Sequence, residues 1–270
     1  MIPLQRIVLV IVGLLLFGAA RLHFEQALTG EYRAAHFMQS QLNRNVRIQA
    51  GQMGFIAALS GLRAAVADIM WIEAHDAWQN TNWGKMKARL DAATELQPRS
   101  LLFWDGAGWH MAWNASVSAL QNRNQPREAL RQKAAKQYIA LGEDYLQRGL
   151  AYNSDHAQLW ESLGRLYEQK MNDPCKAAWA YFEAAARPDA HQYVYRAAIY
   201  QLEHCPGHEA ESLKLALEVY HLGPRERAPH LLKLIDELQI KLNVPPEQRI
   251  DITEDMKEAM PHIPPAPAPK

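Results

Sequence analysis

The most constraining feature of this chain is a pair of helical segments with the spacing of a repeat. Trp160, Leu163 and Tyr167 stand at i, i+3 and i+7, which places them on one helix face. Gly164 on the same segment has no side chain, so a second helix can approach closely. That second segment carries Ala178, Phe182 and Ala185 and ends before Pro188. The pattern predicts a helix–turn–helix unit that cannot bury its apolar face alone and must stack on neighbours.

The same period extends in both directions along the chain. From Ser154 to Pro188 is 34 residues, and from Pro188 to Pro224 is 36. Pro98, in the phrase LDAATELQP, closes an earlier unit. The interval of 56 residues from Pro98 to Ser154 is too long for one unit. We expect an insertion there, made of residues 114–126 and an extended second helix over residues 127–152.

Strand signals are nearly absent between residues 54 and 242, since no alternating Val/Ile/Thr runs are bounded by turn residues. The expected fold is all-α: a right-handed solenoid of about four helix pairs ending near residues 98, 154, 188 and 224. A last helix over residues 227–242 caps it. Residues 243–270 hold seven of the fifteen prolines, which predicts a flexible, Pro-rich tail.

The complete W-x2-L-G-x2-Y signature at Trp160 resembles the tetratricopeptide repeat (TPR) superfamily, and the resemblance covers residues 62–242. The chain is also similar to a looser set of membrane-anchored bacterial repeat proteins. That likeness lies in GLRAAVADIMW, FWDGAGWHMAWNAS and RGLAYNSDHAQLWESLGRLYEQK. Those proteins usually carry proline where this chain has Ser154. The resemblance implies architecture and location, and no activity.

The N-terminus predicts a membrane segment. Residues 7–20 contain no polar side chain, and Arg6 and Arg21 flank them. Residues 1–22 are interpreted as an uncleaved transmembrane anchor or as a signal cut after the small residues 18–20, and a buried helix of a soluble protein is the remaining alternative. Residues 23–53 would form a helical stalk. The apolar stretch 54–72 contains Arg63 and Asp68, so we interpret it as a core-facing helix. Most of the chain is then expected on the periplasmic side of a bacterial inner membrane.

Charge and motifs narrow the function. Lys and Arg number 29, as do Asp and Glu, so no basic excess favours nucleic acid. Phosphate-binding loops and the HExxH and GxSxG motifs are missing. We therefore predict a protein that is not an enzyme and holds no cofactor. Cys175, Cys205, His204 and His208 fit no standard zinc spacing.

The two cysteines are expected to meet in space. Cys175 begins the second helix of the third pair, and Cys205 ends the first helix of the fourth. These helices run antiparallel, so the start of one meets the end of the other. In an oxidising compartment the pair would form a disulfide. Two buried, inert thiols remain the alternative.

In stacked helix pairs the first helices line the concave side, which makes them the expected binding groove. The candidate groove residues mix aromatic, amide and cationic groups: His75, Trp78, Trp104, His110, Asn114, Arg165, Gln169, Tyr193 and Arg196. This mixture suits a protein or peptide partner, so the expected function is a membrane-anchored scaffold. Six of eight tryptophans fall within residues 71–113, with Trp109 and Trp113 on one face. A carbohydrate-binding or enzymatic protein using that Trp-rich face is the alternative, and a purely structural spacer is a third.

Overall fold

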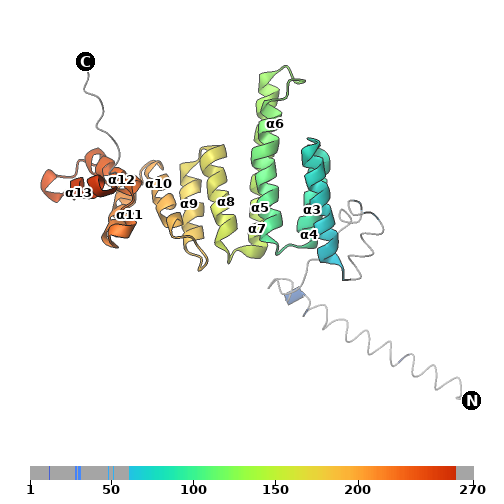
Figure 1. Ribbon diagram of the computed structural model, residues 1–270, viewed down its shortest axis with the longest axis horizontal. Helices are drawn as coiled ribbons and strands as arrows, with labels where there is room; N and C mark the ends of the chain where they lie inside the picture. Colours follow the sequence, from blue (N-terminus) through green and yellow to red (C-terminus); the bar gives the residue numbers. More distant parts are fainter. Residues whose placement is uncertain are drawn as a thin grey trace, which may run out of the picture. The chain divides into compact units, whose positions relative to one another are not determined.

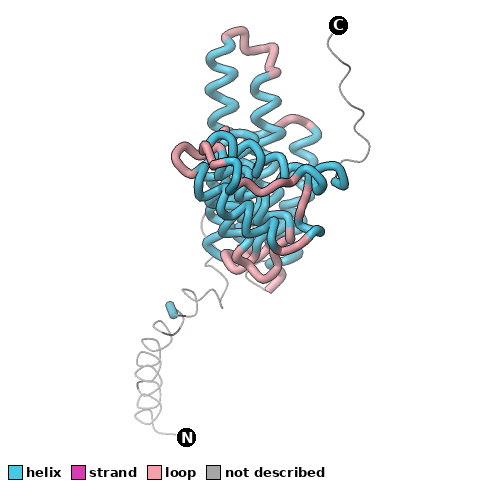
Figure 2. The backbone as a smooth tube through the Cα atoms, turned by 90° about the vertical axis from the view of Figure 1, so that its left-hand side faces the viewer, coloured by secondary structure: helices cyan, strands magenta, loops and turns pink. Residues whose placement is uncertain are grey.

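The computed structural model describes residues 61–259 and six isolated positions before them: Val12, Leu28, Gly30, Glu31, Ile48 and Gly51. Over these residues the secondary structure is helical, without strands (Figures 1 and 2). The all-α prediction is confirmed to that extent. None of the described helices is long and apolar enough to cross a bilayer. The anchor predicted for residues 1–22 and the stalk predicted for 23–53 lie outside the described residues, apart from the isolated positions.

The chain divides into two units, residues 1–100 and 101–270. In the first, α3 (Arg63–Gln79) and α4 (Trp83–Leu96) form a helical hairpin. Thr81 turns the chain at a φ of 52°. The Asn82 side chain then accepts a hydrogen bond of 3.0 Å from the Lys85 N–H, which caps the start of α4.

The second unit holds the remaining helices. The first, residues 101–120, consists of α5 (Leu101–Trp109), the π-helical η1 (His110–Ala115) and α6 (Ser116–Leu120). After it come α7 (Glu128–Asn153), α8 (Ala157–Leu166), the π-helical η2 (Tyr167–Met171), α9 (Pro174–Ala185), α10 (Tyr193–Glu203) and α11 (Glu209–His221). The 3-10 turn η3 (Pro224–Glu226), α12 (Pro229–Lys241), the 3-10 turn η4 (Pro246–Gln248) and α13 (Thr253–Ala259) complete the unit. From α7 to α13 each α-helix contacts the next (Figure 1).

The turn between η2 and α9 shows why the helices begin and end where they do. Asn172 takes the left-handed conformation with a φ of 52°, which ends η2. The Asp173 side chain accepts a 3.0 Å hydrogen bond from the Lys176 N–H. Pro174 occupies the first turn of α9, where its missing N–H removes no helical hydrogen bond. The sequence Asn-Asp-Pro therefore separates the two helices of the third pair.

Glycines set how closely paired helices approach. A Cβ at Gly164 would lie 2.7 Å from ring carbons of Tyr181, so α8 and α9 pack as the repeat signature predicts. The second pair is tighter still. A Cβ at Gly142 of α7 would lie 2.6 Å from the Ala112 Cβ and 2.8 Å from the Gly108 carbonyl oxygen. The helix over residues 101–120 therefore touches α7 with its backbone.

The expected insertion differs from the structure. Residues 114–120 continue the first helix, and only residues 121–127 are non-helical. The extra length therefore consists of two lengthened helices. Their hairpin extends past α8 and α9 (Figure 1).

The prediction of a flexible tail beginning at residue 243 is wrong for residues 244–258. Ile252 is buried, and Val244, Ile250 and Met256 pack around it against α11 and α12. The Gln239 side-chain oxygen accepts a 2.7 Å hydrogen bond from the Ile250 N–H. These apolar residues lie between the prolines and bury the outer side of α12. Thus α13, rather than α12, covers this end of the stack.

Candidate functional site

The first helices of the second unit are joined side to side by carboxylates, and we call this surface the first-helix face. It is formed by α5, η1, α8, η2 and α10. At one edge, Asp105 of α5 accepts hydrogen bonds from two donors of α8. The Ser162 hydroxyl lies 2.6 Å and the Gln158 amide 3.0 Å from its oxygens. Polar side chains on this face thus connect neighbouring helix pairs.

A buried carboxylate makes the next connection. The side chain of Glu161 is only 7% exposed. It accepts a 2.8 Å hydrogen bond from the Tyr193 hydroxyl and a 3.0 Å bond from the His191 ring nitrogen. Burial, together with the hydrogen bond to Glu161, raises the pKa of Tyr193 above its ordinary value. Tyr193 was predicted to contact a partner, and its hydroxyl joins α8 to the start of α10.

A second glutamate, Glu168, repeats this arrangement about two helical turns further along. Glu168 accepts a 2.7 Å hydrogen bond from the Tyr181 hydroxyl and a 2.9 Å bond from the Gln201 amide. Burial first, and Glu168 second, raise the pKa of Tyr181 far above its ordinary value. Arg165 lies near the Tyr181 and Tyr193 hydroxyls and lowers both pKa values slightly. Within the described residues its half-buried guanidinium has no hydrogen bond or ion pair.

Arg196 is engaged within the fold. Its guanidinium forms an ion pair with Glu226 of η3, and the Gln192 amide donates to the same carboxylate. Both contacts tie α10 to the turn before α12. The prediction that Arg196 is available to a partner is therefore not supported by its contacts.

The other end of the first-helix face is aromatic. The Trp109 and Trp113 rings stack with centroids 4.6 Å apart, and Trp109 is 44% exposed. The Lys170 ammonium of η2 lies 5.5 Å from the Trp113 ring centroid, a cation–π distance. Partial burial lowers the pKa of Lys170. Trp113 and Lys170 belong to π turns of neighbouring helices, and π turns occur frequently at functional sites.

The remaining predicted groove residues are scattered. The prediction that Trp104 lines the groove is wrong. Its side chain is only 3% exposed and packs against Tyr145 and Tyr152 of α7. Its Cβ also lies where Gly149 leaves space. The six-tryptophan stretch therefore does not form one surface. By contrast, Gln169 is exposed beside Lys170.

Two further pairs of predicted groove residues contact each other. The Asn114 amide and the His110 ring nitrogen are hydrogen bonded at 2.9 Å within η1. His75 and Trp78 lie in α3 of the first unit, with ring centroids 5.0 Å apart. The rings of this second pair belong to a different unit from the first-helix face.

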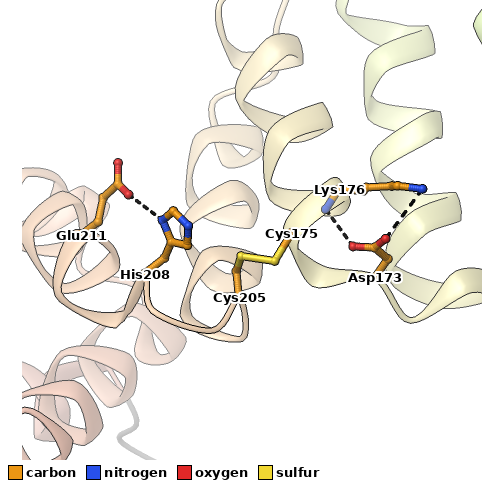
Figure 3. The surroundings of a disulfide bond; sticks show 6 residues. All are labelled: Asp173, Cys175, Lys176, Cys205, His208 and Glu211. Atoms are coloured by element: carbon orange, nitrogen blue, oxygen red, sulfur yellow. Dashed lines mark hydrogen bonds and ion pairs between the residues drawn. A yellow bond between two sulfur atoms is a disulfide. The ribbon is translucent and has the colours of Figure 1, made fainter.

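The cysteines form a disulfide (Figure 3). Cys175 lies in the first turn of α9 and Cys205 directly after α10. Their Cα atoms are 4.9 Å apart and their sulfurs 2.04 Å. The bridge uses both sulfurs, so neither is a thiolate ligand. His208 donates instead to Glu211 at 2.9 Å. In the described part of the chain, no cluster of His, Cys, Asp and Glu side chains could hold a metal ion.

Comparisons with protein-family models, curated proteins and solved structures found no match to this chain. Function therefore has to be inferred from the side chains themselves. Sequence reasoning missed Glu161, Glu168 and Lys170, since charged residues on a helix are usually solvated. They stand at i, i+7 and i+9 of one helical segment. This spacing predicts that they contact other helices only when the position of the neighbouring first helix is known.

Proposed function

We propose that this chain is a membrane-anchored scaffold whose first-helix face binds a partner protein or peptide. In this proposal the helix pairs belong to a TPR-like, right-handed solenoid. Residues 1–22 hold it in a bacterial inner membrane, with the bulk of the chain on the periplasmic side. One observation carries the proposal: Trp109, exposed and stacked on the half-buried Trp113, lies on a face whose other side chains are largely hydrogen bonded to one another.

The helix contacts support the repeat arrangement. Each α-helix from α7 to α13 contacts the next, and α5 also contacts α8, the first helix of the following pair. Contacts limited to neighbouring units are the property that defines a solenoid. The Cys175–Cys205 disulfide supports the location, because such bridges persist in oxidising compartments.

The chemistry of the face supports a peptide-like partner. The carboxylates Asp105, Glu161 and Glu168 already accept hydrogen bonds, so they are poor sites for a polycation. Lys170 offers a donor beside Trp113, and Arg165 and Gln169 offer further donors on the same helical segment. Such a mixture of donors and aromatic surface suits backbone carbonyls and apolar side chains better than a polyanion.

A carbohydrate ligand is the second candidate, and the exposed ring of Trp109 favours it, since flat aromatic surfaces stack on sugars. The candidate surface is narrower than the stretch 71–113, because Trp104 is buried. A glycan array probed with the full chain separates the two candidates. Binding of the chain to one class of glycan, and loss of that binding in Trp109→Ala, would favour a carbohydrate ligand.

Photocrosslinking of the full chain in its native membrane tests the proposal. A photoreactive amino acid replaces Gln169, which is exposed on the first-helix face. A matched variant carries it at Lys214, which is 75% exposed on α11, a second helix. We expect a discrete adduct from position 169 and none from position 214. Adducts of equal yield from both positions, or none from position 169, would contradict binding at this face.

The full chain also tests the location. Alkaline washing should leave it in the membrane fraction, and detergent should release it. A reporter that is active only in the cytoplasm, fused after residue 270, should give no signal. Release by washing with an intact N-terminus would contradict the anchor.

A further inference from the structure

The tryptophan pair retains the hydrogen-bonding capacity that Trp160 of the same unit has used. The Trp160 indole N–H donates to the Ser154 carbonyl at 3.2 Å. Within the described residues, the indole N–H groups of Trp109 and Trp113 have no hydrogen-bond partner. The exposed end of the face thus combines stacked rings, two indole donors and the Lys170 ammonium.

That combination matches one ligand chemistry closely. A polyproline-II segment presents flat pyrrolidine rings to aromatic side chains. Its carbonyl groups have no internal hydrogen bonds, so indole and ammonium donors can bind them. Because proline restricts the backbone beforehand, little conformational entropy is lost on binding. A shallow aromatic surface can therefore bind such a segment without a deep pocket.

The chain itself carries a segment of this kind. Residues 260–270 read MPHIPPAPAPK and hold five prolines in eleven residues. They directly follow α13, which is docked on α12 in the second unit. A polyproline-II segment of this length spans about 34 Å.

The distance from the end of α13 to the tryptophan pair determines whether the segment can come from the same copy of the chain. Contacts lead from α13 to α12, α10, α8 and α5 in four steps. At roughly 8–10 Å per step the path is roughly 32–40 Å. Two turns of polyproline II within the site use about six residues and leave about 15 Å for the approach. The segment is therefore too short to bind within its own chain.

We infer that the Trp109–Trp113–Lys170 surface binds the proline-rich segment 260–270 of a second copy. This inference rests on the proposed function, since it uses the aromatic end of the same face. The contact joins two different surfaces, so it is heterologous and can link copies into rows. Anchoring the copies in one membrane would raise their local concentration and favour this weak contact.

A peptide titration tests the site. The receptor is the full chain in nanodiscs, shortened only by removal of residues 260–270, and the ligand is a synthetic peptide of those residues. Tryptophan fluorescence should change saturably. A control peptide with all five prolines replaced by alanine should bind at least tenfold more weakly.

Three variants locate the binding. Trp109→Ala with Trp113→Ala should weaken the peptide at least tenfold. Lys170→Glu, which keeps both rings, should weaken it several-fold. Trp179→Ala is the matched control, because Trp179 is 49% exposed and pairs with Trp160 away from this surface. It should leave affinity unchanged. Equal affinity in all variants, or no binding at millimolar peptide, would overturn the inference.

Self-association of the intact chain provides the second readout. Two differently tagged copies in shared nanodiscs should co-purify, and deletion of residues 260–270 from both should abolish this. Co-purification that persists after deletion would overturn the assignment of this segment. If the peptide fails to bind while the position-169 adduct persists, this inference fails and the proposed function stands. Absence of both peptide binding and the position-169 adduct would contradict this inference and the proposed function.

Discussion

The second and third helix pairs both pack closely at a glycine, but their helices differ in length. In the third pair, α8 and α9 are short, and Gly164 allows the Tyr181 ring to lie against α8. In the second, the helix over residues 101–120 and the 26-residue α7 meet through backbone contacts at Gly142. The third pair keeps the 34-residue period and the second departs from it.

The two pairs also differ in the side chains that their first helices leave exposed. In the third pair the polar side chains of the first helix, such as Glu161 and Glu168, are hydrogen bonded to the next first helix. In the second pair the π turn η1 follows Trp109 and leaves it exposed. In our proposal, the third pair uses the polar surface of its first helix for stacking, and the lengthened second pair leaves aromatic surface for a ligand.

The largest expected effect is removal of the disulfide, which is confined to the third and fourth pairs. Cys175→Ala with Cys205→Ala should lower the free energy of unfolding by about 3–4 kcal/mol, because the closed loop spans 30 residues. Urea denaturation of the variant, and of the parent with reductant, measures it. Hydrogen exchange should increase in α9 and α10 more than in α7. Equal increases in all three would show that the pairs unfold together.

Alanine at the two glycines compares the pairs directly. Gly142→Ala should cost about 3 kcal/mol, because its Cβ would meet backbone atoms that cannot move alone. Gly164→Ala should cost about 1 kcal/mol, since the Tyr181 ring can shift. Gly84→Ala in α4 is the control, where the nearest atom lies 4.0 Å away, and should cause no loss. Thermal melts rank the three, and the reverse order would refute the contrast.

Alkaline titration should reveal the tyrosines that join helices. Burial and the hydrogen bond to Glu143 of α7 raise the pKa of Tyr167 to about 12, and the pKa of Tyr181 is also raised. A raised folded pKa means that their contribution to stability is complete below pH 10 and is lost as the pH rises through the folded value. Ultraviolet titration should show late ionisation, and Tyr167→Phe should remove one such group. Ionisation near pH 10 would contradict the burial.

The smallest effect concerns α13 alone. Hydrogen bonds from Tyr220 and Arg227 lower the pKa of Asp255 below its ordinary 3.8. A lowered folded pKa means that this contact stabilises docking above about pH 4 and is lost as the pH falls through the folded value. The protection of α13 amides, after correction for the intrinsic pH dependence of exchange, should therefore fall in acid before that of the helix pairs. Asp255→Asn should remove the pH dependence, and an equal loss of protection in α8 at the same pH would argue against a local event.

The fold was predictable where neighbours in sequence are neighbours in space. Trp160, Gly164 and Ala178 lie within one unit, so their spacing revealed the third pair. Gly108 and Gly142 lie on different helices and meet only across the hairpin, and no local pattern reports that. The C-terminal prediction failed because prolines dominated the composition, while Ile250 and Ile252 between them supply enough apolar surface to dock.

The site was predictable only in part. Trp104 and Trp109 lie on the same helix, one buried against α7 and the other exposed. Side chains five residues apart on a helix point in directions that differ by about 140°, so Trp104 and Trp109 cannot both face α7. The sequence does not show which of the two faces packs against α7. The π turn then shifts the register of Trp113. Arg165 could be placed on the correct helix. Of the two tyrosines beside it, Tyr181 comes from α9 of the same pair, whereas the position of Tyr193 depends on the stacking of the next pair.

The Cys175–Cys205 bridge also limits how far the molecule can be stretched. A chain held by its N-terminus and pulled through its C-terminal segment would normally lengthen as helices unravel. The 30-residue segment between the sulfurs has a contour length of about 100 Å, and the bridge shortens it to a Cα separation of 4.9 Å. While the bridge is intact, the segment between the two cysteines cannot be extended by the applied force. A tethered assembly would therefore yield first in its other helices and keep the α9–α10 junction closed.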